Sequence, residues 1–172
     1  MRLGVLSDTH DQLTRVRRAV HLLRAAGAEA LVHCGDLTGP EVVAACAELP
    51  CYFAFGNHDA DVVAELRQTI DRAGGVCLGW GGEVTLAGKR VAVTHGHMRS
   101  DVRRVMGARP DYLLSGHSHV RRDWREGATR RLNPGALHEA DEYTVALLDL
   151  AADEVRFLTL PEEGGPPVRP LS

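Results

Sequence analysis

Short apolar runs alternate with amphipathic stretches over the first 75 residues, and few folds accommodate this alternation. Three apolar runs are predicted to be strands, at 2–7, 30–36 and 51–59. Three stretches have helical spacing, at 12–27, from Pro40 to before Pro50, and at 60–75. Strands that alternate with helices favour a parallel sheet with helices packed on it.

The rest of the chain predicts antiparallel pairing. Turn residues between apolar segments indicate three hairpins, over 82–97, 120–135 and 142–160. A short helix is expected at 101–107 and a further strand at 111–119. Parallel α/β followed by antiparallel β predicts an α/β (mixed α+β) fold with two β-sheets packed face to face and flanked by helices.

The length of 172 residues suits one domain with a sizeable core, expected over 1–160. The Pro- and Gly-rich segment 161–172 is expected to be a flexible tail. The four cysteines lack CxxC spacing and are predicted to be reduced core thiols. Since no export signal or membrane-spanning run is seen, we expect a cytoplasmic protein.

Polar motifs occur where the predicted strands end. They are SDTH (Asp8, His10), GD (Asp36), GNHD (Asn57, His58), HGH (His95, His97) and GHSH (His117, His119). GHSH alone could be a polar loop tip. Because ligands bind at the carboxyl ends of strands in open α/β sheets, we expect the five motifs to form one site.

The residue types of these motifs suggest a two-metal hydrolytic centre. Asp8 and His10, offset by two, could hold one ion, and Asp36 could bridge to a second ion through its other oxygen. Asn57 offers a carbonyl oxygen, and the remaining nitrogen ligands would be His95, His117 and His119. Two divalent ions and two aspartates leave a cationic pocket suited to a phosphate.

Two further features of the motifs support this interpretation. His58 follows Asn57, so its side chain should diverge from the metals and could donate a proton to the leaving oxygen. Glycines accompany the key residues and would allow sharp turns or close backbone approach, at positions 35, 56, 96 and 116.

The order DxH, GD, GNHD, H and GHxH resembles that of the calcineurin-like metallophosphoesterase superfamily. The short length and the NPG at 133–135 are similar to its stand-alone bacterial and archaeal phosphodiesterase branch. The resemblance covers about residues 2–160 and implies an αββα metallophosphoesterase-like sandwich. Two residues depart from the pattern of the family: Asp11 follows SDTH where glycine is common, and Ala136 follows NPG where serine is common. These departures affect the expected shape of the pocket rim and remove no metal ligand.

The resemblance also implies roles for single residues. By motif, a first metal site would comprise Asp8, His10, Asp36 and His119, and a second would comprise Asp36, Asn57, His95 and His117. His58 matches the catalytic histidine of the superfamily. The implied cofactors are two divalent metal ions per chain, with manganese favoured and nickel, iron, zinc or a mixed pair as alternatives.

We therefore expect a metal-dependent phosphoesterase, favoured as a phosphodiesterase of small or nucleotide-like diesters, in which a metal-bridging hydroxide attacks phosphorus. The alternative is a non-catalytic metal-binding scaffold on the same fold, resembling the scaffold subunit of the retromer. The intact GNHD favours the enzyme. No membrane partner is expected, aromatic residues at 5 % give little sign of a nucleic-acid surface, and a homo-oligomer stays open.

Other charged and polar residues receive more ordinary interpretations. Residues 99–131 contain nine arginines against four acidic residues, within a chain of net charge −3. These arginines could attract an anionic substrate, but a solvated surface is the favoured interpretation. We predict structural roles for His21 and His33, a core position for Cys34 and a surface-loop position for His138. His97 could approach the substrate from the pocket wall or be a simple loop histidine.

Overall fold

The structure is a computed structural model and describes residues 1–161. Its helices and strands follow in the order β1 (Arg2–Leu6), α1 (Leu13–Ala25), β2 (Ala30–His33), α2 (Pro40–Cys46), β3 (Cys51–Ala54), the 3₁₀-helix η1 (Asn57–Val62), α3 (Val63–Arg72), β4 (Val76–Gly79), β5 (Gly81–Leu86), β6 (Lys89–Thr94), α4 (Arg99–Gly107), β7 (Tyr112–Leu114), β8 (Arg122–Glu126), β9 (Thr129–Asn133), β10 (Thr144–Asp149) and β11 (Glu154–Thr159).

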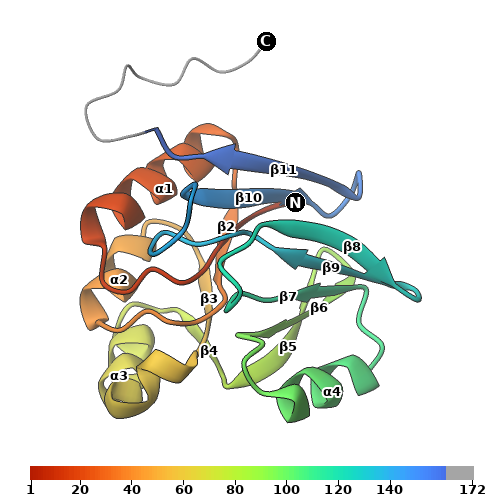
Figure 1. The fold of residues 1–172 in the computed structure, drawn as a ribbon, viewed down its shortest axis with the longest axis horizontal. Coiled ribbons are helices and arrows are strands. Elements are labelled where there is room, and N and C mark those ends of the chain that lie inside the picture. Colours follow the sequence, from red (N-terminus) through yellow and green to blue (C-terminus); the bar gives the residue numbers. More distant parts are fainter. Residues whose placement is uncertain (162–172) are drawn as a thin grey trace.

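These strands form two sheets (Figure 1). The first sheet has the order β11-β10-β1-β2-β3-β4, in which β1 to β4 are parallel and β10 pairs antiparallel with β1. The second has the order β5-β6-β7-β9-β8 and is parallel from β6 through β7 to β9. The predicted parallel arrangement of the first three strands and the three predicted hairpins are confirmed.

Two parts of the topology were not predicted from the sequence. The short strand β4 was not predicted, because four residues between a Gly-Gly pair and Trp80 give little periodicity. The hairpin β10–β11 joins the first sheet, beside β1, a placement that the sequence pattern did not define. Residues at opposite ends of the described chain therefore meet in the middle of one sheet.

Apolar side chains fill the spaces between the layers. Helices α1, α2 and α3 pack on the outer face of the first sheet through residues such as Leu23, Val42 and Leu66. A second cluster, which includes Val5, Val32 and Val93, lies between the sheets. Helix α4 covers the second sheet through a third cluster. The predicted αββα sandwich is confirmed.

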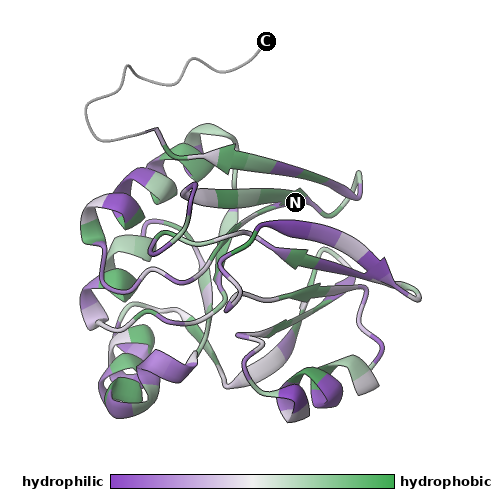
Figure 2. Cartoon of the chain, viewed as in Figure 1, coloured by the Kyte–Doolittle hydropathy of each residue, from purple (hydrophilic) through white to green (hydrophobic). Residues whose placement is uncertain are grey.

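Hydropathy follows these layers. Apolar segments concentrate in the strands and on the inner sides of the helices, whereas α4 and the edge strand β8 are largely hydrophilic (Figure 2). Strands β1 and β2 are buried on both faces, which explains their continuous apolar sequence. The four cysteines are free, and three of them are buried.

Two predictions concern the C-terminal segment 161–172 and membrane-spanning helices. Apart from Pro161, the predicted flexible tail lies outside the described residues. Within residues 1–161, no helix has the length and apolar character required to cross a bilayer.

Candidate metal centre

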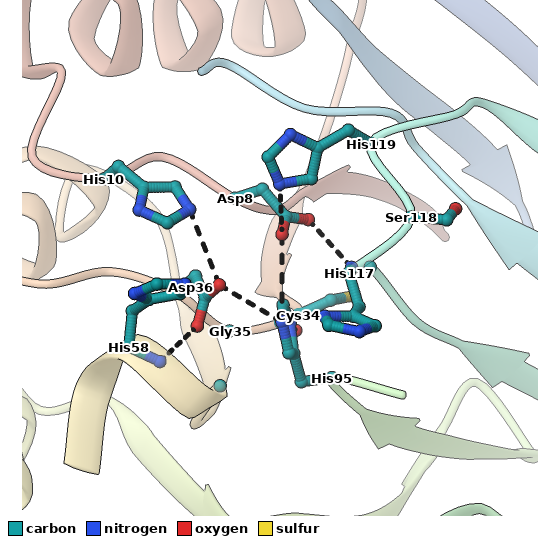
Figure 3. Close-up of polar contacts among 12 residues, drawn as sticks. Asp8, His10, Cys34, Gly35, Asp36, His58, His95, His117, Ser118 and His119 are labelled. Atoms are coloured by element: carbon teal, nitrogen blue, oxygen red, sulfur yellow. Dashed lines mark hydrogen bonds and ion pairs between the residues drawn. The ribbon is translucent and has the colours of Figure 1, made fainter. Parts of the chain in front are cut away.

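The loops that follow β1, β2, β3, β6 and β7 bring the predicted site residues to one edge of the sandwich (Figure 3). Potential ligand atoms of Asp8, His10 and His119 lie within 4.8 Å of one another. The same holds for a second group, made of Asp8, Asp36 and His95. Both sheets therefore contribute side chains to one cluster.

Asp8 stands at the centre of the cluster and is fully buried. Its Oδ2 accepts a hydrogen bond from the backbone N–H of His117, at 3.1 Å. Its Oδ1 lies 3.1 Å from Nε2 of His119 and 3.8 Å from Nε2 of His95, yet has no hydrogen-bond partner among residues 1–161. A buried carboxylate oxygen without a donor is costly unless a cation occupies the space beside it.

Asp36 is almost fully buried between two histidines. Its Oδ2 lies 3.4 Å from Nε2 of His10 and 3.2 Å from Nε2 of His95, and its Oδ1 accepts the backbone N–H of His58. Burial alone would raise the pKa of Asp36, but the contact with His95 and the His58 N–H lower this pKa to about 2. Asp36 is therefore ionised at neutral pH and faces both groups of ligands.

The orientations of two imidazoles suit metal coordination. Nδ1 of His95 lies 2.9 Å from the carbonyl oxygen of Cys34, and Nδ1 of His119 lies 3.0 Å from that of Glu139. Since a carbonyl oxygen only accepts, each Nδ1 carries the proton, and each Nε2 presents a lone pair to the aspartates. Nε2 of His95 is buried and has no hydrogen-bond partner in the described part of the chain.

The histidines around the cluster have perturbed pKa values. Burial lowers the pKa of His10, and the charges of His138 and His58 act in the same direction. Although burial would lower the pKa of His95, its contact with Asp36 and the charge of Asp8 raise it. Neutral His10 and an imidazole held between two carboxylates are both suitable metal ligands.

Backbone conformation at the strand ends is unusual. Several candidate ligands adopt the left-handed region, namely Asp8 (φ 53°), His10 (φ 42°), Asp36 (φ 57°), His117 (φ 70°) and His119 (φ 57°). Such conformations cost about 1–3 kcal/mol each for residues other than glycine and concentrate at functional sites. Contacts in the rest of the fold must therefore compensate for the cost of holding these residues in this conformation.

Two of the predicted glycines permit close approach to the aspartates. A Cβ at Gly56 would collide with Oδ1 of Asp36, and a Cβ at Gly116 would lie 2.5 Å from Oδ2 of Asp8. No larger residue fits these two positions without displacing a carboxylate. The sequence-based expectation of close backbone approach is therefore confirmed at both.

Three predicted site residues lie at the periphery of the cluster. His117 places its ring 5.1 Å from that of His95, and His58 places its ring 4.9 Å from that of His10. Asn57 begins η1 and is exposed, and its amide makes no hydrogen bond with any described residue. The structure thus brings Asp8, His10, Asp36, His95 and His119 together tightly and leaves Asn57, His58 and His117 at the rim.

The sequence-based reasoning did not identify two contributions to the centre. Asp59 is buried and accepts three backbone N–H groups, from Asp36 (3.0 Å), Thr38 (2.8 Å) and Gly56 (2.8 Å). Burial raises the pKa of Asp59, against these hydrogen bonds. His138, from the loop after β9, lies with its ring 4.7 Å from that of His10. Only the position of Asp59 in GNHD hinted at its role.

The donor set fits divalent metal ions. Three buried atoms face one another without hydrogen-bond partners among residues 1–161: Oδ1 of Asp8, Nε2 of His10 and Nε2 of His95. Carboxylate oxygens and imidazole nitrogens without thiolate are ligands of manganese, iron, nickel and zinc. Cys34 presents its carbonyl oxygen to His95, while its thiol belongs to the core between the sheets.

Comparisons with known proteins agree with this geometry. The chain is similar to a phosphodiesterase of Methanocaldococcus jannaschii, with 26 % identity over 170 residues that cover 93 % of this chain and 99 % of the relative. A solved archaeal phosphodiesterase has the same fold, with a TM-score of 0.84, 24 % identity and coverage of 93 % of this chain and 100 % of that one.

A more distant structure has the same fold. Wild-type Vps29 of Entamoeba histolytica, solved in complex with zinc, matches with a TM-score of 0.59 and 15 % identity over 93 % of this chain and 98 % of its own. The family model of the calcineurin-like phosphoesterase superfamily domain matches residues 1–153, which include every candidate ligand. The chain therefore belongs to the calcineurin-like phosphoesterase superfamily.

Proposed function

We propose that this protein is a phosphodiesterase that requires two divalent metal ions held by the clustered aspartates and histidines. The observation that carries the proposal is the group of three buried atoms on Asp8, His10 and His95 that have no hydrogen-bond partner within residues 1–161. Their desolvation is favourable only if cations are bound between them. We also infer a cytoplasmic location from the free cysteines.

The proposed ligands divide into two sets around Asp36. Asp8, His10 and His119 would hold the first ion together with one oxygen of Asp36. The same carboxylate would hold the second ion together with His95, and Asn57 and His117 at the rim would complete that site. Manganese is the favoured metal, with nickel, iron, zinc or a mixed pair as alternatives that the same oxygen and nitrogen donors accept.

Asp8, Asp36 and His58 would have different roles in hydrolysis. Bound divalent ions would supply charge for the phosphate and lower the pKa of an attacking water. Asp36 and Asp8 limit the positive charge of the centre, and the exposed His58 beside His10 would donate a proton to the leaving oxygen. The backbone N–H of His58 is fixed on Asp36, which positions this donor relative to the metals.

The test is hydrolysis of bis-p-nitrophenyl phosphate and p-nitrophenyl phosphate, after chelation and after addition of manganese, nickel, zinc or magnesium. We expect activity only with added metal, and higher kcat/KM for the diester. A preference for the monoester would overturn the diester assignment. Lack of activity with every metal, in protein shown to carry two ions per chain, would favour the non-catalytic scaffold.

A further inference from the structure

A groove of about 630 Å³ begins at Gly96, between the candidate site residues His95 and His97, and extends along α4. One wall is a single face of α4, on which Arg99 and Arg103 stand four residues apart. The other wall comes from Glu126 and Arg131 of the β8–β9 hairpin. The groove therefore begins one residue from His95, a candidate metal ligand.

Positive charge dominates the walls of this groove. Arg99 and Arg103 are exposed, and neither pairs with a carboxylate among residues 1–161. Arg131 pairs with Glu126, the single acidic residue of the lining. Three arginines and one glutamate leave a net charge of +2, in a protein whose total charge is −3.

Arg131 is held in place rather than extended into solvent. Its guanidinium lies 4.8 Å from the ring centre of Trp124, and its side chain is 18 % exposed. Its Nε is buried and donates to no acceptor in the described residues. Because Glu126 and Trp124 hold the Arg131 guanidinium, a positive charge is fixed on this wall of the groove.

The spacing of Arg99 and Arg103 on α4 suits the binding of successive phosphate groups of one ligand. Four residues of α-helix rise about 6 Å, so Arg99 and Arg103 present two guanidinium groups along the groove. The floor between them is apolar, formed by Val102 and Met106. Such a surface accommodates a sugar or base beside the phosphates rather than a bare ion.

We propose that this groove binds a second phosphate of the substrate, beyond the one that reaches the metals. The substrate class is then a nucleotide-like diester that carries an additional phosphate, on a single nucleotide or on a short oligonucleotide. This inference rests on the proposed function for the orientation of the substrate, but the binding of the second phosphate does not require turnover.

Calorimetric binding of thymidine 3′,5′-bisphosphate and thymidine 5′-monophosphate to manganese-loaded protein tests the proposal. We expect the bisphosphate to bind about tenfold more tightly, as one charge-assisted hydrogen bond provides. The double variant R99Q/R103Q should reduce this ratio to near one. The control R72Q removes an exposed arginine of α3 and should keep the ratio.

Equal affinity of the two ligands for the wild-type protein, or a ratio that survives in R99Q/R103Q, would overturn the proposal. The dinucleotide pTpT separates the two sources: tighter binding than that of the bisphosphate would identify oligonucleotides, and equal or weaker binding would identify single nucleotides. Failure of the proposed function would appear differently, as absence of bis-p-nitrophenyl phosphate hydrolysis by the wild-type protein.

Discussion

At the scale of single residues, the centre places opposite demands on the same side chains. Asp8 and Asp36 are buried, which penalises their charge, but they must be ionised to bind metals. The pKa of Asp36 is lowered to about 2, despite burial, by His95 and by the backbone N–H of His58. The chain thus maintains a buried negative charge at neutral pH through one proposed ligand, His95, and through the backbone N–H of the proposed proton donor, His58.

Replacement of His58 separates catalysis from metal binding. His58 is exposed and its ring faces His10, but no atom of its ring belongs to the two ligand groups. We expect H58A to keep its metal content and to lose about 10²–10⁴-fold in kcat, because it removes a general acid. Metal analysis and steady-state kinetics check this, with H21A on the exposed surface of α1 as control. Unchanged kcat would exclude His58 from proton transfer.

His33 makes the stability of the protein depend on pH. Its Nδ1 accepts the N–H of Gly35 at 3.2 Å, and its Nε2 lies 3.1 Å from Oγ1 of Thr9. Protonation of Nδ1 would break the first of these contacts. Burial, together with the charge of His95, lowers the pKa of His33 from 6.5 to about 3.

The sign of this effect follows from proton uptake. Below pH 6.5 the unfolded chain binds a proton at His33 that the folded protein does not bind, so stability falls as the pH decreases toward 3. At pH 5 the loss is about 2 kcal/mol. In H33Q, urea unfolding should show a smaller difference between pH 7 and pH 5 by this amount. The control H21Q should behave as the wild type, and an unchanged difference in H33Q would contradict the prediction.

At the scale of elements, η1 joins two loops of the centre. Asp59 in η1 accepts N–H groups from the loop after β2, at Asp36 and Thr38, and from Gly56 after β3. Since Asp36 is the proposed shared ligand, the geometry of this carboxylate depends on a residue that does not itself face the metals.

Removal of the Asp59 carboxylate should therefore affect stability and metal affinity together. D59A leaves two buried N–H groups and one half-buried N–H group without acceptors, and we expect a loss of about 3 kcal/mol or more in the free energy of unfolding. The metal affinity should fall as well. Denaturant unfolding and metal titration measure the two effects, with the exposed neighbour D61A as control. A stable D59A that binds metal normally would contradict the role of Asp59.

The local sequence pattern was sufficient to predict most helices and strands. It was insufficient to predict which distant strands pair with each other. Helical spacing and strand–helix alternation predicted α1, α2 and α3, and the Ala87–Lys89 turn predicted the hairpin of β5 and β6. The pairing of β10 with β1 depends on packing between distant segments, which no local period encodes. The short β4 is likewise defined by its neighbours β3 and α3.

In the candidate site, too, the local motifs predicted some features, whereas others depend on how distant loops fold. The convergence of Asp8, Asp36 and His119 was predictable because their motifs lie at strand ends, and such ends meet at one edge. The function of Asp59 and the contact of His138 with His10 were not predictable, since each depends on how a loop folds back over the centre. The metal-binding roles of Asn57 and His117 stay predictions.

At the scale of the whole molecule, the centre connects the two sheets. Asp8 and Asp36 follow strands of the first sheet, whereas His95 and His119 follow strands of the second. Any ion bound by both sets links the two halves of the sandwich, so metal binding should stabilise the complete fold.

We expect chelation to lower the Tm by roughly 5–10 °C relative to protein with manganese at about 100 times its Kd, which corresponds to about 2.7 kcal/mol. Differential scanning calorimetry measures this shift. D36N, which removes the proposed shared ligand, should lose the shift and carry fewer than two ions per chain, whereas the exposed control D61N should keep both properties. An undiminished shift in D36N would refute the bridging role.

The position of β1 between β2 and β10 has a consequence for synthesis on the ribosome. Val5 pairs with Ala146, so the N-terminal strand emerges long before its antiparallel neighbour. Until β10 is released from the exit tunnel, one edge of β1 is open to wrong partners. Asp8 follows β1, and its carbonyl group accepts the N–H of Leu137. The nascent chain therefore completes the surroundings of its first candidate metal ligand only after Leu137 and β10 have been synthesised.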